Sequence, residues 1–320
     1  AYVEDNDTII ANTSPVFQAP TSDQLLVGCD PGLSTMVQTT YADKQKVSFY
    51  LSLDNRFQPL EQFSQEMDLD DDRSIRTMMK LPTFPISSKD IDNKTMSKRS
   101  RTKMNNKKAN DDTIMQTEAD LANSAVNVAL SYNKEAIINK HKKQRENANK
   151  LRSFYQGKWC KQQRRSQPRM KQRGLNHVMK YHRDRIQYHH SAATSTINNN
   201  VDLKFFYGAA GRGTGSRIKG FLRRSHLDVI ATIEQKSKVF ITDEYRTTKL
   251  CCLCHHVVNH PRKQSGKLNL GTVICVNPEC IGKKFGCIAR SRDANASMNM
   301  IMSGLQQELY GSVPSPFLRS

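Results

Sequence analysis

The stretch LLVGCDPGLSTM, residues 25–36, decides the fold that we expect for this chain of 320 residues. An apolar run here ends in Asp30, and a Pro-Gly turn follows, so we expect Asp30 at the carboxyl end of a buried strand. The stretch KVFITDE (238–244) repeats this design and closes on Asp243 and Glu244. Open α/β sheets bind ligands outside the carboxyl ends of their strands, so acids at two such ends indicate a site.

A third acid completes this pattern. Asp293 lies in ARSRDANASMNM (289–300), where it opens a helix rich in small residues. Asp30, Glu244 and Asp293 would repel one another in one pocket unless cations lay between them. Two divalent metal ions about 3.5–4 Å apart would satisfy three carboxylates and stabilise both oxygens of a phosphoryl displacement. We therefore predict metal-assisted cleavage of a nucleic-acid phosphodiester.

Composition indicates a nucleic-acid partner. The formal net charge is +19, and it is unevenly placed: residues 94–190 carry 24 Lys and Arg against 7 Asp and Glu, whereas residues 1–93 carry 7 against 15. A basic segment of this length most often meets a polyanion, with nucleic acid first, although a solvated basic face is the alternative. No apolar stretch approaches the roughly 20 residues of a membrane span, so we expect no membrane partner.

Local patterns predict the first elements of the chain. Residues 25–30, 34–41 and 46–53 have the features of three short strands, which would form a meander. A short acidic helix is predicted at 68–80, after which 97–112 is interpreted as an exposed polar linker.

The middle of the chain, from 113 to 165, is helical in composition and becomes basic over residues 140–173. Phe154, Tyr155 and Trp159 are interleaved with these cations. Such rings could stack on bases while the cations follow phosphates; alternatively, they dock the helices onto the core.

Further strands follow the basic segment. We predict a strand at 201–208, a flexible glycine-rich loop at 209–217, a helix at 216–234 and a strand at 238–244. This order of strands and helices is typical of an RNase H-like α/β fold with a mixed sheet.

Two cysteine pairs have the spacing of zinc knuckles: Cys251 and Cys254 form C-x2-C, and Cys275 and Cys280 form C-x4-C. Two turns that each present two thiolates make a tetrahedral site, and closed sites of this kind are structural zinc sites. A thiol oxidoreductase would leave the second pair unexplained, and a zinc deaminase would need an H-x-E motif. The sequence offers further ligands as alternatives, His255 in place of Cys254 among them: Cys252, His255, His256, His260 and Cys287.

These motifs resemble those of the TnpB and Fanzor proteins, the transposon-encoded relatives of type V CRISPR effectors. CDPGLSTM (29–36) resembles their first RuvC motif. YRTTKLCCLC (245–254) is similar to the threonine-serine-lysine stretch that opens their zinc ribbon, and SRDANASMNM (291–300) is similar to their Asp-Arg-Asp-x-Asn-Ala-Ala motif, with Ser291 at the first Asp.

The resemblance implies an RNA-guided DNA endonuclease with a RuvC domain. Its catalytic Mg²⁺ would be held by Asp30, Glu244 and Asp293, its structural Zn²⁺ by the four cysteines, and its partners would be DNA and a guide RNA. In TnpB the middle acid ends the fourth strand, whereas FFYGAAG (205–211) offers none. Fanzor-like members place another glutamate just before the zinc ribbon, which Glu244 matches.

Two alternatives to this role of Glu244 remain. Glu244 could be a surface acid that caps the strand. Asp243 could take the catalytic place instead, although strand alternation should turn it to the opposite face.

The resemblance also implies a domain order. RuvC parts at 1–60, 201–249 and 291–320 would be separated by a basic helical insertion at 61–200 and a zinc ribbon at 250–290 that binds the target nucleic acid. Because 29 residues precede Asp30, we expect a fragment or truncated copy that lacks the N-terminal recognition and wedge domains.

Other functions compete with guided cleavage. A cleavage-incompetent remnant would bind nucleic acid through the ribbon and the basic insertion, and an unguided RuvC-type resolvase would leave the ribbon unexplained. SKRSRTK (97–103) could be a nuclear import signal or a nucleic-acid contact. We therefore predict a nuclear location for a eukaryotic chain and a cytoplasmic one otherwise.

Overall fold

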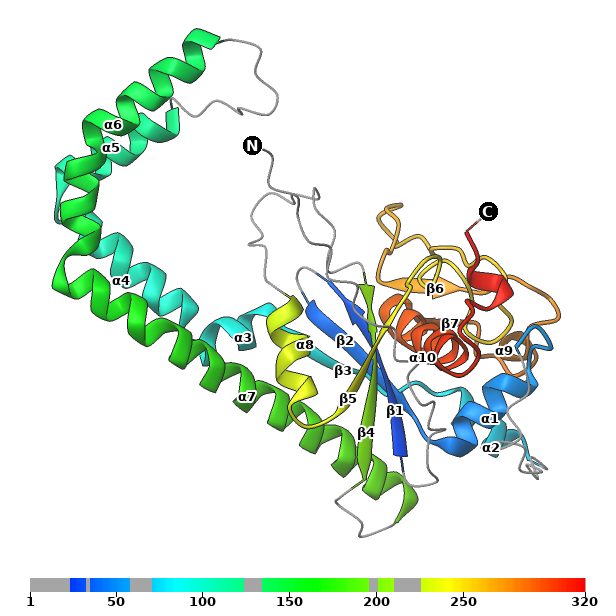
Figure 1. Ribbon diagram of the computed structural model, residues 1–320. Coiled ribbons are helices and arrows are strands. Elements are labelled where there is room, and N and C mark those ends of the chain that lie inside the picture. The colour runs from blue at the N-terminus through cyan, green and yellow to red at the C-terminus, as the bar shows by residue number, and fades with distance from the viewer. Residues whose placement is uncertain are drawn as a thin grey trace, which may run out of the picture. The chain divides into compact units, whose positions relative to one another are not determined.

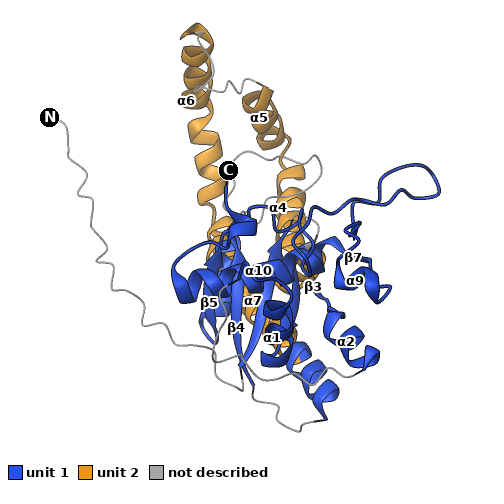
Figure 2. Ribbon diagram, turned by 90° about the vertical axis from the view of Figure 1, so that its right-hand side faces the viewer, with its two compact units in different colours: residues 1–85, 185–320 blue, residues 86–184 orange. Residues whose placement is uncertain are grey.

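The computed structural model describes residues 24–32, 35–57, 71–123, 134–195, 201–209 and 226–319. The chain forms two compact units, which Figure 2 colours separately. Unit 1 comprises residues 1–85 and 185–320, and unit 2 comprises residues 86–184.

Unit 1 is built on a five-stranded mixed sheet in the order β3-β2-β1-β4-β5 (Figure 1). The strands are β1 (Gln24–Pro31), β2 (Thr35–Ala42), β3 (Phe84–Ser87), β4 (Asp202–Gly208) and β5 (Lys238–Thr242). β2 runs antiparallel to β1, whereas β4 runs parallel to both β1 and β5. The carboxyl ends of β1, β4 and β5 therefore meet at one edge of the sheet.

The long helix α10 (Arg292–Tyr310) covers one face of this sheet (Figure 1). The contact is close because each side contributes a glycine, Gly28 on β1 and Gly304 on α10. A Cβ at Gly28 would overlap the carbonyl oxygen of Ser297, and one at Gly304 would overlap the ring of Phe206. The Ser297 hydroxyl also donates to the carbonyl of Gln38 at 3.0 Å. Small residues in the α10 sequence thus let the helix lie directly on β1 and β4.

The helix α8 (His226–Glu234) contacts the opposite face. There the hydroxyl of Tyr207, on β4, is hydrogen-bonded to Nδ1 of His226 at 2.7 Å. Neighbouring residues of a strand point to opposite faces, so Tyr207 faces α8 while Gly208 faces α10.

Residues 46–53 do not form a strand, so the predicted three-strand meander is wrong. The segment is the helix α1 (Lys44–Ser52), and its N-cap is Asp43, whose side chain accepts a hydrogen bond from the backbone N–H of Lys46 at 2.8 Å. Val47 and Tyr50 are buried. Their spacing of three places them on one helix face, which the alternating pattern of the same segment concealed.

The third strand on the β2 side is β3, which comes from the proline-containing stretch that we had not predicted as a strand. The Thr39 hydroxyl donates to the carbonyl of Phe84 at 2.9 Å, and the Thr40 hydroxyl donates to that of Pro82 at 2.7 Å. Pro85 lacks an N–H group but is tolerated because β3 is an edge strand.

Most other predicted elements of unit 1 are confirmed. The acidic helix is α2 (Asp72–Met79), and the strands predicted at 201–208 and 238–244 are β4 and β5. The helix predicted at 216–234 is confirmed over α8, whereas residues 210–225 and most of the glycine-rich loop lie outside the described residues.

Unit 2 is helical. Its helices are α3 (Ser88–Lys94), α4 (Ser97–Ala109), α5 (Asp112–Asn123), α6 (Lys134–Gln156) and the first part of α7 (Lys158–Thr194). The prediction of a linker at 97–112 is wrong: α4 is a helix without a buried residue, and its Lys108 is paired with Glu118 of α5 at 2.8 Å. Lys, Arg, Met and Ala are good helix formers, so a polar helix of this composition can persist.

The carboxyl-terminal third of unit 1 carries the cysteines and a small antiparallel ribbon. Its elements are β6 (Thr272–Ile274), α9 (Ile281–Lys284), β7 (Ala289–Ser291) and the 3₁₀ turn η3 (Ser315–Phe317). One apolar cluster joins Leu26 and Phe206 of the sheet, Ile301 of α10, and Leu250 and Leu253 of the cysteine segment. Across the described ranges, each helix is too short or too polar to cross a membrane.

Candidate functional site

Four cysteines converge at one point of unit 1. The sulfur atoms of Cys251, Cys254, Cys275 and Cys280 all lie within 4.8 Å of one another. Two of the separations are 4.0 Å, between Cys251 and Cys280, and 3.5 Å, between Cys254 and Cys275. Tetrahedral zinc with Zn–S bonds of 2.3 Å requires sulfur atoms about 3.8 Å apart. The four thiols can therefore hold a metal ion such as zinc.

The electrostatics of this cysteine site favour a thiolate. Hydrogen bonds from Cys254, Cys275 and Cys280 hold the pKa of Cys251 well below its usual range. The cluster is mostly buried, with Cys254 the more accessible member. Such closed four-sulfur sites have a structural role.

Cys252 is occupied elsewhere. Its sulfur accepts a hydrogen bond from Arg290 at 3.0 Å, and its backbone N–H donates to the side-chain oxygen of Asn295 at 2.9 Å. Burial raises its pKa to about 11, which keeps it a neutral thiol. Cys252 thus anchors the knuckle to α10.

The alternative histidine ligands also have other partners. Nδ1 of His256 is 3.2 Å from the carbonyl oxygen of Cys254, and Nδ1 of His260 is 2.8 Å from that of Thr272. The sulfur of Cys287 lies 3.6 Å from the carbonyl oxygen of Phe285.

His255 links the knuckle to the segment after α1. Its Nδ1 lies 2.7 Å from the carboxylate of Asp54, which also accepts hydrogen bonds from Arg56. Burial would raise the pKa of Asp54, but the hydrogen bonds from His255 and Arg56 outweigh burial and hold that pKa below its usual range. A buried hydrogen bond between His255 and Asp54 therefore fixes the knuckle on the body of unit 1. No local sequence pattern indicates this pair, because Asp54 and His255 lie far apart in the chain.

Three carboxylates approach the carboxyl-end edge of the sheet. Asp30 is the penultimate residue of β1, Glu244 comes two residues after β5, and Asp293 lies in the first turn of α10. By strand alternation Asp30 and Gly208 share the face that α10 covers. The N-cap Ser291, whose hydroxyl accepts from the N–H of Ala294, fixes the start of α10.

The electrostatics of Asp30 show that the three acids are neighbours. Burial raises the pKa of Asp30 to about 8, with further contributions from Asp293 and then Glu244, while Arg292 opposes the rise. Burial also raises the pKa of Tyr207, and the charges of Cys29, Glu244 and Asp30 add to that effect. Both shifts place the negative charges around the end of β4.

Glu244 fills the space at the end of β4. A Cβ added to Gly208 would overlap Oε2 of Glu244, and it would lie 2.9 Å from Cδ of Pro31 and 3.0 Å from Cε of Met300. The Glu244 side chain thus reaches across to the strand that offers no acid of its own. Gly208, the glycine in FFYG, was the sequence signal for this arrangement, because a residue without a side chain leaves space for another side chain. The sequence alone does not say which residue fills that space.

Asp243 turns away from this carboxylate edge. Its carboxylate accepts a hydrogen bond from the backbone N–H of Tyr245 at 3.0 Å and pairs with Arg319 at 3.2 Å. The expected alternation at the end of β5 therefore holds.

Arg292 is a cation beside the carboxylates that the sequence analysis did not single out. Its guanidinium contacts Oδ1 of Asp293 at 2.8 and 2.9 Å, and both side chains are partly exposed, at 38% and 33%. The sequence Ser-Arg-Asp at 291–293 contained the signal, since a cation next to an acid can pair with it.

The two sites differ in compactness. Among the described residues, the four cysteines are the one group of three or more Cys, His, Asp or Glu that could hold a metal as the side chains lie. The three carboxylates are close enough to shift a pKa, but their oxygens are not gathered to that degree.

Two of the three aromatic side chains singled out in the basic helices, Phe154 and Tyr155, make internal contacts. Phe154 and Tyr155 pack edge to face at 5.2 Å, and the Tyr155 hydroxyl donates to Glu118. Lys108 lies 5.5 Å from the centre of the Tyr155 ring. These contacts support the docking interpretation of Tyr155 and Phe154.

No protein-family model matches this chain, and no curated protein matches it. The two sites themselves therefore carry the functional inference.

Proposed function

We propose that this chain is the nuclease part of an RNA-guided DNA endonuclease of the TnpB and Fanzor type, with an RNase H-like RuvC domain. The observation that carries the proposal is the meeting of Asp30, Glu244 and Asp293 at one sheet edge, from three distant segments. The strand order, with β4 and β5 parallel to β1 and β2 antiparallel, is compatible with that fold.

The donor set of the carboxylate edge fits magnesium. Carboxylate oxygens are the hard ligands that Mg²⁺ takes, and Asp30, Glu244 and Asp293 supply three such groups. When bound, the ions would supply activation of water and stabilisation of charge on the phosphoryl oxygens.

The residues of the carboxylate edge are held by their backbones. Asp30 belongs to the β1 ladder, in register with Gln38 of β2. The carbonyl of Glu244 accepts hydrogen bonds from the N–H of Thr247 at 3.2 Å and from its hydroxyl at 2.9 Å. Fixed main chains with adjustable carboxylates let the side chains close on cations without moving the sheet.

Arg292 has a place in this mechanism. Its guanidinium neutralises Asp293 in the structure. With Asp293 holding a metal ion, the Arg292 guanidinium would be free to donate hydrogen bonds to phosphate oxygens of a bound strand at this edge.

The zinc ribbon would support the target strand. Its hairpin exposes Arg262, Lys263 and Lys267, and the pairing of His255 with Asp54 ties the adjacent knuckle to the catalytic unit. Cations on a metal-stabilised hairpin are suited to phosphate contacts.

Cleavage by the purified chain tests the proposal. In the presence of Mg²⁺, end-labelled single-stranded and double-stranded DNA should be cut by the wild type and not by the Asp30→Asn or Asp293→Asn variant. Without Mg²⁺ the wild type should not cut either DNA. Asp243→Asn is the matched control, because it removes an acid of the same edge that points to Arg319. Mg²⁺-dependent cleavage that survives Asp30→Asn would refute the assignment.

One observation favours a second function, a nucleic-acid-binding protein without cleavage. The carboxylates are not gathered as tightly as the cysteines, while the basic insertion and the ribbon are intact. DNA binding by the wild type with no cleavage in Mg²⁺ or Mn²⁺, with or without added RNA, would establish this second function.

A further inference from the structure

Part of unit 2 has no acidic residue. Between Glu146 and Asp184 the sequence contains eleven Lys and Arg but no Asp or Glu. Most of this stretch belongs to α7, so its positive charges lie along one continuous helix.

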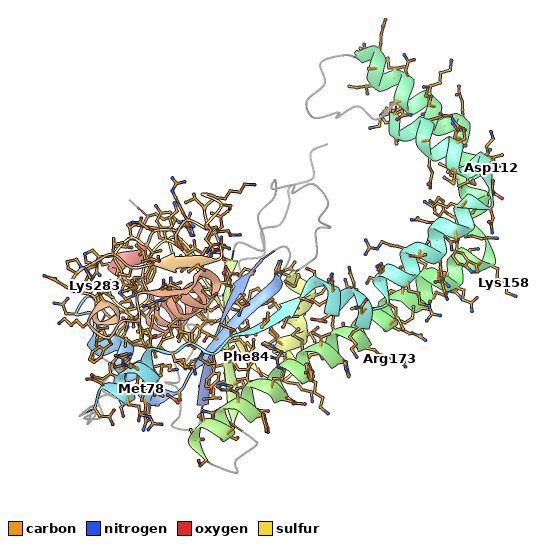
Figure 3. All side chains as sticks on the ribbon, turned by 180° about the vertical axis from the view of Figure 1, so that it is seen from behind. Met78, Phe84, Asp112, Lys158, Arg173 and Lys283 are labelled. Carbon is orange, nitrogen blue, oxygen red and sulfur yellow. The ribbon has the colours of Figure 1, made fainter. Side chains whose placement is uncertain are left out.

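Five of these cations lie on one face of α7, which we call the α7 basic face. They are Lys158, Lys161, Arg165, Arg169 and Arg173, and all five are exposed along a shallow groove that Gln162, Ser166 and Met170 also line. At about 100° per residue, the five fall within an arc of about 120°, and at about 1.5 Å per residue they extend over about 22 Å. Figure 3 labels Lys158 and Arg173, which mark the two ends of the face.

The opposite side of α7 packs inside unit 2. Cys160 and Leu175 are buried, and a Cβ at Gly174 would overlap the backbone of Lys94. The orientation of the helix within its unit is therefore fixed, and it presents the α7 basic face outward.

The α7 basic face is electrostatically unbalanced. Within the described part of the chain, none of its five cations forms an ion pair. Like charges at a spacing of four residues destabilise a helix. An external polyanion would remove this repulsion, so the face is complementary to phosphates.

The chemistry of the face discriminates between nucleic-acid forms. Binding of single strands combines cations with aromatic rings on which bases stack. The groove along the α7 basic face is lined by no aromatic residue. The nearby Phe154 and Tyr155 pack against each other, Tyr155 is hydrogen-bonded to Glu118 of α5, and the half-buried Trp159 does not line the groove. A row of cations without a stacking platform suits a duplex, whose phosphates face outward and whose bases are already stacked.

We propose that the α7 basic face binds the phosphate backbone of double-stranded DNA without reading its sequence. This inference deepens the proposed function, since it names the partner of the basic insertion. It does not depend on cleavage.

The test measures binding of a 20-base-pair DNA duplex to the full chain by fluorescence anisotropy at several salt concentrations, without divalent metal. The variant Lys161→Gln/Arg165→Gln/Arg169→Gln removes three contacts. The slope of log K against log salt should fall by about 2.7, which corresponds to about 10²–10³-fold weaker binding at 0.1 M salt. Gln is a good helix former, and circular dichroism checks that α7 is retained.

The matched control is Lys142→Gln/Lys143→Gln/Lys150→Gln. It removes the same charge from exposed positions of α6 in the same unit. Its slope should stay within about one unit of the wild type. Equal losses in both variants would overturn the proposal, because they would show a general charge effect.

Two further arms make the result decisive. Lys substitution at Arg165 and Arg169 should preserve binding, because charge rather than guanidinium geometry is required. A 20-nucleotide single strand should bind more weakly than the duplex, and tighter binding of the single strand would overturn the inference. Duplex binding is measured without divalent metal and cleavage only with it, so a failed nuclease assignment and a failed α7 basic face give different results.

Discussion

The cysteine knuckles and the carboxylate edge each gather negative side chains from distant segments, yet they hold them differently. The four sulfur atoms lie within 4.8 Å of one another, in positions that zinc can occupy as they stand. The three carboxylates share an electrostatic environment but not a common ligand position. Short thiol side chains on tight turns are placed by the backbone, whereas Glu244 reaches its place through a longer side chain. Permanent metal binding is expected at the first site and reversible binding at the second.

The largest expected effect breaks the permanent site. Cys251→Ser or Cys275→Ser should lose the bound zinc and unfold the ribbon, because structural zinc contributes roughly 10–16 kcal/mol of apparent binding free energy in finger peptides. Zinc content by mass spectrometry and limited proteolysis measure the result. Cys287→Ser, in the same ribbon, is the control and should keep the metal. Zinc retained by Cys251→Ser would show that the ligand set is wrong.

The reversible site should respond to magnesium by linkage. A Mg²⁺ concentration of 100 times Kd should raise the unfolding free energy of the folded chain by about 2.7 kcal/mol. Thermal melts of the zinc-loaded protein should show this rise for the wild type and for Asp243→Asn, but not for Asp30→Asn. A rise of equal size in Asp30→Asn would show that magnesium stabilises the chain without binding at the carboxylate edge.

Without magnesium the carboxylate edge should be sensitive to pH. The pKa of Asp30 is raised to about 8, so between pH 4 and 8 the folded chain binds a proton that the unfolded chain has released. Stability is therefore lost as the pH rises through this window, by on the order of 2 kcal/mol after allowance for partial exposure. Denaturation of wild type and Asp30→Asn should diverge as the pH rises from 5 to 8, with the variant the more stable. Parallel curves of stability against pH for the two proteins would contradict the raised pKa of Asp30.

The smallest effect concerns Arg292. Exposed ion pairs contribute about 0.2–1 kcal/mol, so freeing Asp293 from Arg292 should tighten magnesium binding by about 1.4–5-fold. Calorimetric titration of Arg292→Gln measures this change, with Arg319→Gln, whose partner is Asp243, as the control. Arg292→Gln should also bind DNA more weakly than the wild type in the presence of magnesium. Weaker binding of both ligands would indicate a purely structural role for Arg292.

The four-cysteine site and the acids at the strand ends could be predicted from the sequence. C-x2-C and C-x4-C spacing is local, so the turns that present Cys251 and Cys275 are encoded where the ligands are. An apolar run that ends in an acid likewise marks Asp30 and Glu244 at strand ends. Their meeting at one edge needed the strand order, which follows from how β1, β4 and β5 pair across the chain.

The wrong prediction at residues 46–53 and the unpredicted strand β3 have the same physical cause: packing against neighbouring elements decides the structure of both segments. In residues 46–53, Val47, Phe49 and Leu51 alternate, while Val47, Tyr50 and Leu51 fit a helix, so the pattern alone could not separate the two. The Asp43 cap and burial against the core select the helix. Pro85 lacks an N–H group and is tolerated in β3 because β3 lies at the edge of the sheet, and an edge is defined by neighbouring strands rather than by local sequence.

The close fit between Gly208 and Glu244 makes these two positions depend on each other when either changes. A side chain at 208 would force the Glu244 carboxylate to move, because its Cβ would overlap Oε2 of that residue. Restoring an acid to β4 by Gly208→Glu alone should therefore be more harmful than the same change in a Glu244→Gly background, where Cδ of Pro31 at 2.9 Å and Cε of Met300 at 3.0 Å still crowd the new Cβ but Oε2 does not. The two positions are therefore coupled: the combined effect of Gly208→Glu and Glu244→Gly on stability should differ from the sum of the two single effects.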